Sequence, residues 1–377
     1  AGLQAALESG LLNMIGEEGD EAYYTDTMSL CLNPELTEWS GADTRIVYTP
    51  LHGSGNVPVR EILRRIGIKN ISVVKEQEEP DGSFPTVKAP NPEDPNAFTL
   101  AFDLANKTGA NLILATDPDS DRLGAAVRRR DGRFQVLTGN QIGSILIHYI
   151  LSTRNEQGTL PGNGLVVRSI VSTRMADAIC AYYGVELREV LTGFRFISEQ
   201  IAESLETKEH TFLFGFEESY GYLAGPYVRD KDAVIGSMLI CEMAAYYRSI
   251  GSSIKQRLEE IYAQYGRYLN KVDSFEFPGL TGMEKMASIM QKLRDEPLTE
   301  LAGHKVVKVT DYKKPEETGL PAANVLIYTL DNGATVVVRP SGTEPKIKTY
   351  FTTLGKDLAE AQAQKDALAA AIEPILA

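Results

Sequence analysis

Cysteine is scarce in this chain of 377 residues: there are three, Cys31, Cys180 and Cys241, and they lie far apart. Their odd number and wide spacing match neither a disulfide framework nor a zinc site, and they favour a reducing, cytoplasmic location. The four histidines also lack the spacing of metal ligands. No apolar run approaches about 18 residues, so we expect no membrane-spanning helix.

Positive charge is also in deficit, because 38 lysines and arginines face 51 aspartates and glutamates, a net charge of −13. No long basic run interrupts this excess, so neither nucleic acid nor a membrane surface is an expected partner. The remaining composition, 43% hydrophobic and 24% charged, is typical of a globular protein. The length is sufficient for two or three domains.

Short apolar runs alternate with amphipathic segments from residue 44 onward. Residues 45–48 predict a strand, a helix follows with Pro58 in its first turn, and a second strand is predicted at 71–74. The same change from helix through glycine to strand recurs at Gly109 and Gly184. Such alternation predicts βαβ units and mostly parallel sheets.

Two regions depart from this alternation. Residues 76–97 contain five prolines, which favours an extended excursion or a loop over a helix or an inner strand. Beyond about residue 280 the pattern predicts helices at 282–294 and 356–373 and strands at 305–310, 324–330 and 334–339. We therefore predict an α/β protein with two domains of mostly parallel sheets, 1–135 and 136–269, and a smaller C-terminal α+β domain, 270–377.

The strongest local motif is the loop between the apolar runs 112–115 and 123–127. It holds Asp117, Asp119 and Asp121, three carboxylates at alternate positions that can converge on one hard cation such as Mg²⁺. An EF-hand does not fit, because its sixth position would be Arg122 and its twelfth Arg128. The alternative reading is a solvated acidic turn.

A second motif follows the predicted strand 334–339. Arg339 offers a bidentate fork to phosphate, and Ser341 and Thr343 flank Gly342, which lets backbone N–H groups approach an anion. The spacing is not that of a Walker loop. The alternative is a turn with Ser and Thr as caps.

Weaker motifs come from three further segments. Glu217 and Ser219 combine a carboxylate with a hydroxyl, which suits the vicinal hydroxyl groups of a sugar but also the start of a helix. The segments 192–195 and 229–232 carry less information as isolated strings, because such loops usually only connect elements.

Together these motifs make the chain resemble the α-D-phosphohexomutase superfamily, in particular its phosphoglucomutase branch. Residues 117–122 resemble that family's metal loop, 215–221 its sugar-recognition loop and 339–343 its phosphate-binding loop. Segments 49–53 and 192–195 match in the same order, so that the resemblance covers nearly the whole chain. One departure is Arg195, where the family often has lysine, a change that keeps the charge but alters the geometry.

The resemblance implies four domains around a deep cleft, of which this sequence shows the last three. The family's nucleophile is a phosphorylated serine in a Ser-His-Asn-Pro type segment of the first domain, and it also supplies a fourth Mg²⁺ ligand. No serine of this chain neighbours a histidine. We therefore expect an N-terminally truncated enzyme whose missing partner is its own phosphoserine domain and which is inactive alone.

The resemblance also implies a reaction, the interconversion of glucose 1-phosphate and glucose 6-phosphate through a phosphoserine and glucose 1,6-bisphosphate. The implied roles are Mg²⁺ binding by Asp117, Asp119 and Asp121, contact with the transferring phosphoryl group by Arg122, phosphate binding by Arg339, Ser341, Gly342 and Thr343, sugar contacts by Glu217 and Ser219, and further substrate contacts by Thr192, Gly193 and Arg195. Lys231 is expected near the reacting oxygen or, equally, as an exposed partner of Asp230 or Asp232. Other functions stay open: a mutase for mannose, glucosamine or pentose phosphates, or a non-catalytic phosphosugar-binding protein.

Overall fold

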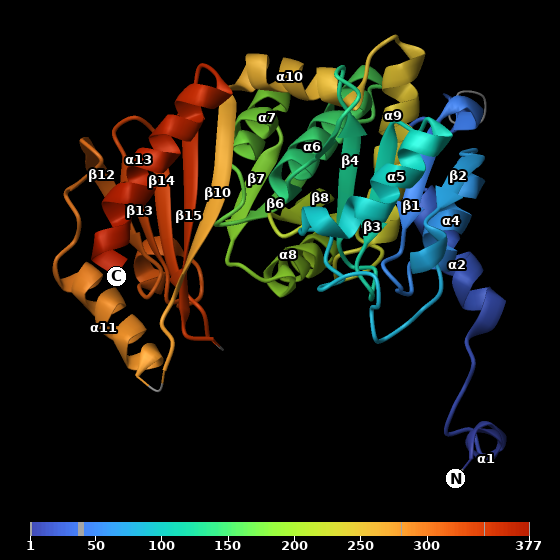
Figure 1. Cartoon of the computed structure of the whole chain (residues 1–377), viewed down its shortest axis with the longest axis horizontal. Coiled ribbons are helices and arrows are strands. Elements are labelled where there is room, and N and C mark those ends of the chain that lie inside the picture. The colour runs from blue at the N-terminus through green and yellow to red at the C-terminus, as the bar shows by residue number, and fades with distance from the viewer. Residues whose placement is uncertain (1, 37–40, 280, 343, 377) are drawn as a thin grey trace.

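The computed structural model describes residues 2–36, 41–279, 281–342 and 344–376. Three β-sheets follow one another along the chain and stand side by side in Figure 1, from sheet A on the right to sheet C on the left. Two helices, α1 (Leu3–Glu8) and α2 (Gly16–Met28), and a 3₁₀ turn, η1 (Gly41–Asp43), precede sheet A. Within the described residues, no helix combines the length and apolar character needed to cross a bilayer.

Sheet A has the strand order β2-β1-β3-β4-β5. Its strands are β1 (Arg45–Thr49), β2 (Asn70–Val73), β3 (Leu112–Thr116), β4 (Leu123–Arg128) and β5 (Phe134–Val136). The first three pair in parallel through the crossover helices α4 (Asn56–Arg65) and α5 (Thr99–Thr108), while β4 and β5 add antiparallel strands at one edge. The loop from β3 to β4 therefore lies at the carboxyl ends of the parallel strands, where ligands bind in open α/β sheets.

Side chains of sheet A alternate between two apolar layers. Val47 and Ile113 belong to a core that includes Phe98 and residues of α5. Ile46 and Leu114 belong to the larger core on the other face, which includes residues of α4 and of α9 (Ala233–Ser249). Alternation with period two is what a sheet buried on both faces requires.

Sheet B has the order β7-β6-β8-β9, with three parallel strands and an antiparallel edge. The strands are β6 (Gly164–Ser169), β7 (Glu186–Val190), β8 (Thr211–Glu217) and β9 (Gly221–Ala224). The helices are α6 (Gly139–Glu156), α7 (Met175–Tyr183), α8 (Phe194–Thr207) and α10 (Ile254–Tyr265). A capping box between Thr138 and Gln141 starts α6, and Gly143 lets the ring of Phe216 pack against that helix, because a Cβ there would lie 2.4 Å from the ring.

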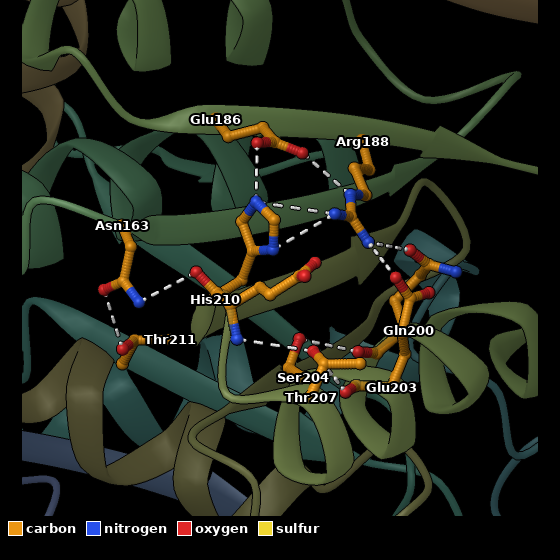
Figure 2. Close-up of polar contacts among 10 residues, drawn as sticks. Asn163, Glu186, Arg188, Gln200, Glu203, Ser204, Thr207, His210 and Thr211 are labelled. Carbon is orange, nitrogen blue, oxygen red and sulfur yellow. Dashed lines mark hydrogen bonds and ion pairs between the residues drawn. The ribbon is translucent and has the colours of Figure 1, made fainter.

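The edge strand β7 carries a polar cluster that Figure 2 shows in detail. His210 Nε2 lies 2.8 Å from Glu186 Oε2, and the Arg188 guanidinium lies 3.2 Å from His210 Nδ1. Arg188 also donates to Gln200 and Glu203 of α8, at 2.8 and 3.1 Å. These charged side chains join α8 to the exposed edge of the sheet and blunt that edge against pairing with another strand.

Sheet C is antiparallel, with the order β10-β15-β14-β13-β12-β11. Its strands are β10 (Arg267–Glu276), β11 (Glu300–Leu301), β12 (His304–Asp311), β13 (Leu326–Leu330), β14 (Thr335–Pro340) and β15 (Lys346–Gly355). Helices α11 (Gly282–Asp295) and α13 (Leu358–Leu376) contribute to a separate core beside the sheet, and α12 (Pro315–Thr318) is one short turn. The predicted fold class, two α/β sheets with parallel centres and a smaller α+β domain, is confirmed.

The proline-rich stretch 76–97 forms an irregular excursion between the turns η2 (Lys75–Gln77) and η3 (Pro95–Phe98). It is tied back to the fold through Thr86, whose hydroxyl lies 2.9 Å from His52 Nε2 and accepts from Gln77 Nε2 at 3.0 Å. The prediction of an extended excursion is therefore confirmed, and it carries Glu93 towards the loop that ends β3.

Candidate active site

The loop after β3 brings three aspartates together. One carboxylate oxygen from each of Asp117, Asp119 and Asp121 lies within 4.8 Å of the others. The backbone N–H groups of Asp121 and Arg122 donate to Asp117 Oδ1 at 3.1 and 2.9 Å, so the loop folds around the first carboxylate. The predicted acidic cluster is thus one compact set of oxygen donors.

This cluster concentrates negative charge that Lys231 and Arg122 offset in part. Burial, together with the neighbouring carboxylates Asp121 and Asp119, raises the pKa of Asp117 to about 7, against the lowering effect of the N–H and guanidinium of Arg122. Asp121 Oδ1 is buried without a hydrogen-bond partner in the described structure. Hard oxygen donors with an unused buried atom suit Mg²⁺, which prefers one or two carboxylates together with substrate phosphates.

Neighbouring segments hold the metal loop in place. The N–H of Ser54 donates to the Pro118 carbonyl at 2.8 Å, and Gly53 allows this approach, since a Cβ there would lie 2.4 Å from Pro118. On the other side, the N–H of Ala233 donates to the Ser120 carbonyl at 3.0 Å. The segment 49–53 and the start of α9 therefore position the loop from both sides.

Arg122 lies at the entrance of β4 and pairs with Glu93 at 2.9 Å. Its Nε also lies 3.8 Å from both Asp117 and Asp121. Glu93 was not predicted from sequence, since it stands 24 residues before Asp117 in the proline-rich excursion. The only local indication of a role for Glu93 was that this carboxylate lies between two prolines.

Lys231 lies against the metal loop and is not simply exposed. Its Nζ contacts Asp121 Oδ2 at 2.8 Å and Asp230 Oδ1 at 3.1 Å, and 15% of the side chain is accessible. Asp232 points elsewhere: it caps α9 at Val234 N and accepts from the hydroxyl of Tyr23 at 2.7 Å. The capped helix thereby fixes the backbone that carries Lys231.

Glu217 ends β8 and faces the other loops. Its Oε1 accepts from the N–H of Gly193 at 2.7 Å, which joins the predicted segment 192–195 to the sugar loop. Burial raises the pKa of Glu217, while this hydrogen bond and the charges of Lys231, Arg122 and Arg339 act to lower it. The carboxylate of Glu217 therefore lies in the combined electric field of charged residues from all three sheets and their loops.

The next residue, Glu218, belongs to the predicted sugar-recognition loop 215–221 but was given no role of its own from the sequence. Its Oε2 accepts from the hydroxyl of Ser169 at 3.1 Å, and burial together with the adjacent Glu217 raises the pKa of Glu218 to about 7. Ser219 follows in the half-buried turn before β9. The end of β8 and this turn thus carry two adjacent carboxylates followed by a hydroxyl.

The remaining predicted residues that the structure describes lie at the end of β14 and in the loop after it, and around the start of α8. Arg339, at the end of β14, donates to the hydroxyl of Tyr350 at 3.4 Å, and Ser341 accepts at Oγ from the N–H of Glu344 at 3.2 Å. Gly342 is exposed with open space around it, whereas Thr343 lies outside the described residues. Near α8, Arg195 stacks 4.5 Å from the Phe196 ring and Thr192 Oγ1 is buried without a hydrogen-bond partner in the described structure.

Models of known protein families match most of the chain. Three models of the phosphoglucomutase/phosphomannomutase family match the chain: α/β/α domain II at residues 22–132, α/β/α domain III at 138–265 and the C-terminal domain at 288–371. The chain belongs to the phosphoglucomutase/phosphomannomutase family. Its loops 117–122, 215–221 and 339–342 come from three successive domains of that family.

Curated relatives carry the name phosphoglucomutase. One from Staphylococcus saprophyticus is 36% identical over 375 residues, covering 96% of this chain and 67% of the relative. One from Staphylococcus aureus is 40% identical over 321 residues, covering 82% of this chain and 57% of the relative. The chain thus spans between about half and two thirds of the length of these relatives.

Solved structures share the fold. A phosphomannomutase described as putative from Thermus thermophilus superposes with a TM-score of 0.66 at 20% identity, covering 95% of this chain and 65% of the other. Parafusin from Paramecium, described as a phosphoglucomutase, superposes with a TM-score of 0.67 at 20% identity, covering 94% and 61%. At this identity the likeness establishes the architecture alone.

Proposed function

We propose that this chain is the substrate- and metal-binding part of a phosphohexomutase that interconverts glucose 1-phosphate and glucose 6-phosphate through a phosphoserine and glucose 1,6-bisphosphate. The observation that carries the proposal is the position of Glu217, which accepts from Gly193 and lies in the field of Lys231, Arg122 and Arg339. The 36–40% identity to phosphoglucomutases favours glucose phosphates. Mannose, glucosamine and pentose phosphates would use the same groups and are the alternative substrates.

In this proposal each segment has a separate task. Asp117, Asp119 and Asp121 hold Mg²⁺, which when bound would neutralise charge on a phosphoryl group. Arg122 orients the transferring phosphoryl group, and Lys231 stands beside the reacting oxygen. The loop that begins at Arg339, with Ser341, Gly342 and Thr343, binds the other phosphate through charge-assisted hydrogen bonds.

Sugar recognition completes the proposed site. Glu217 and Ser219 accept from and donate to ring hydroxyl groups, with Thr192, Gly193 and Arg195 supporting them. Recognising hydroxyl groups separately from phosphate allows either end of the sugar to face the metal loop. We propose that residues 1–135, 136–269 and 270–377 act as the three domains and that the protein works in the cytoplasm, where its cysteines, which form no disulfide, stay reduced.

The proposal is tested with two variants, one expected to weaken phosphate binding and one expected to weaken only the binding of the sugar. Arg339→Ala should weaken both glucose 1-phosphate and inorganic phosphate by roughly tenfold in calorimetric titrations with Mg²⁺, since both present the same anion. Glu217→Ala should weaken only glucose 1-phosphate. The control is Glu206→Ala, which removes an exposed glutamate from α8. If Glu217→Ala reduced both affinities equally, the assignment of the sugar loop would be wrong.

A non-catalytic phosphosugar-binding protein is the second candidate function. The absence of a serine beside a histidine in these 377 residues is compatible with both candidates. Binding of glucose 1-phosphate alone does not separate the two candidates. Turnover of glucose 1-phosphate by the chain joined to a phosphoserine domain of a relative would exclude the binding protein.

A further inference from the structure

A cavity of about 670 Å³ lies at those ends of the sheet A strands that are opposite to the metal loop. Strand β3 runs from Leu112 at the cavity to Thr116 at the metal loop, and β4 returns to Val127 at the cavity. Five strand residues at about 3.3 Å each separate the two places by roughly 15 Å. Residues of α9 and the start of α10 close the cavity, and Figure 1 shows α10 along the upper side of the molecule.

The lining of this cavity is strongly basic. Six cationic side chains line it, and among the described lining residues Asp43 is the one carboxylate. The cations are Arg45, Arg128, Arg129, Arg130, Arg248 and Lys255. In a chain with a net charge of −13, such a concentration of positive charge inside a concave surface focuses the field on small anions.

Several of these cations keep donors available for a ligand. Arg130 has no hydrogen bond or ion pair within the described structure, and the Arg129 guanidinium is 3.6 Å from its nearest carboxylate, Asp131. Arg45 makes one long contact of 3.5 Å to the Thr108 carbonyl. Three cations are engaged within the protein: Arg128 donates to the Ala110 carbonyl at 3.0 Å, Arg248 donates to the Asp43 carbonyl at 2.6 Å, and Lys255 pairs with Glu259 at 2.6 Å.

The start of α10 adds neutral donors on the same side. Ser253 caps this helix of 12 residues by accepting from Gln256 N at 3.2 Å. The other backbone N–H groups of the first turn point out of the start of the helix. The hydroxyl of Ser252 is buried and has no hydrogen-bond partner among the described residues. Apolar walls at Leu112, Val127, Ala244 and Ile254 complete the cavity.

We infer that this cavity is a second ligand site, which binds a phosphorylated small metabolite away from the active site. The phosphate oxygens lie against Arg45, Arg129 and Arg130, because the fork of an arginine guanidinium matches the geometry of a phosphate group. The carbon part of the ligand lies against Leu112 and Val127. The volume falls within the range of about 300–1,000 Å³ that small-molecule sites occupy.

Calorimetric titrations with inorganic pyrophosphate and with ATP, at constant ionic strength, test the inference. The decisive pair is Arg130→Glu and Arg133→Glu, because both arginines are exposed in the same hairpin and the net charge changes equally, but only Arg130 lines the cavity. We expect saturable binding of pyrophosphate that Arg130→Glu weakens by about tenfold or more and Arg133→Glu by less than about threefold. ATP should bind more tightly than pyrophosphate because of the apolar wall.

Two results would overturn the inference. Absence of saturable heat with both probes means that the cavity binds no phosphate ester. Equal weakening by Arg130→Glu and Arg133→Glu means that the protein attracts anions only through its general surface charge. Circular dichroism and the melting temperature of both variants must match those of the unmodified chain, and a repeat with Arg129→Glu provides a second test if Arg130→Glu fails to fold.

Discussion

Asp119 is the exposed member of the aspartate cluster, so a change there disturbs packing least. We predict that Asp119→Asn weakens Mg²⁺ binding by roughly tenfold or more, because the side chain keeps its shape but loses the charge that a hard cation prefers. Calorimetric titration with MgCl₂ measures the effect. Asp103→Asn is the matched control, since it removes an exposed carboxylate from α5. Equal affinities in all three proteins would show that the loop is only an acidic turn.

His148 gives a second prediction, which concerns stability against pH. Its side chain in α6 is buried, and burial, with a smaller contribution from the Arg257 cation, lowers the pKa of His148 to about 4. An unfolded histidine titrates near pH 6.5, so between these values the unfolded chain binds a proton that the folded chain refuses. The folded state must therefore lose stability as the pH falls from about 6.5 towards 4.

We expect His148→Phe to remove this loss, because phenylalanine keeps the edge contacts with Tyr183 and Tyr265 but cannot titrate. The free energy of unfolding in urea at pH 7 and pH 5 measures it. The unmodified chain should lose up to about 2 kcal/mol more than the variant over that range. The same loss in both proteins would contradict the assignment.

At the level of single residues, the sequence predicted those contacts best that are made by residues close together in the chain. Asp117, Asp119 and Asp121 stand at alternate positions of one loop, so their convergence follows from local geometry. Glu93 was missed and Glu218 was assigned no role of its own, because their contacts depend on where a distant excursion and a buried serine come to lie. The site roles of all these residues remain predictions.

Among the secondary-structure elements, α9 contains a buried carboxylate that holds it against its neighbours. Glu242 lies fully inside, and its Oε1 accepts from the N–H groups of Leu32 and Asn33 at 2.8 and 2.6 Å and from the hydroxyl of Tyr149 at 2.9 Å. Burial raises the pKa of Glu242, and these hydrogen bonds act against that rise. The carboxylate therefore ties the segment after α2 to both α6 and α9.

We predict that Glu242→Ala lowers the free energy of unfolding by about 3 kcal/mol or more, since three buried donors lose their acceptor at about 1–3 kcal/mol each. Hydrogen exchange should locate the change at the amides of Leu32 and Asn33. Glu242→Gln keeps an acceptor oxygen in place and should stay within about 1 kcal/mol of the unmodified chain. If both variants were equally destabilised, the charge itself and not the accepted hydrogen bonds would be responsible.

Element prediction succeeded where hydrophobic periodicity was regular and short connections followed. The strands at 45–48 and 71–74 were predicted to within one residue of β1 and β2, and the helix with Pro58 in its first turn is α4. Strand β15 was missed, although it lies between β10 and β14 in sheet C, because it begins directly after a loop rich in Pro and Gly. Its partners are distant in sequence, so pairing and not local pattern establishes it.

On the scale of the whole molecule, three sheets present their loops to one another. The largest core contains residues of sheets A and B together with Tyr312, Val337 and Tyr350 of the sheet C region. Tyr312 also donates to Glu189 Oε1 of β7 at 3.1 Å. This shared packing explains how Arg339 comes within electrostatic reach of Glu217, a relation that no local sequence pattern contains.

The last prediction is that these 377 residues bind the substrate but do not turn it over. A phosphoryl carrier must be an accessible, activated nucleophile. Ser120 stands in the metal loop, but its hydroxyl is buried without a hydrogen-bond partner in the described structure and its backbone has a φ of 59°. A coupled assay for glucose 6-phosphate, with glucose 1-phosphate, Mg²⁺ and a trace of glucose 1,6-bisphosphate, should show no activity, while calorimetry on the same preparation shows binding that Arg339→Ala weakens. Turnover near 10 s⁻¹, which is about the median for enzymes, would mean that a nucleophile lies within these residues.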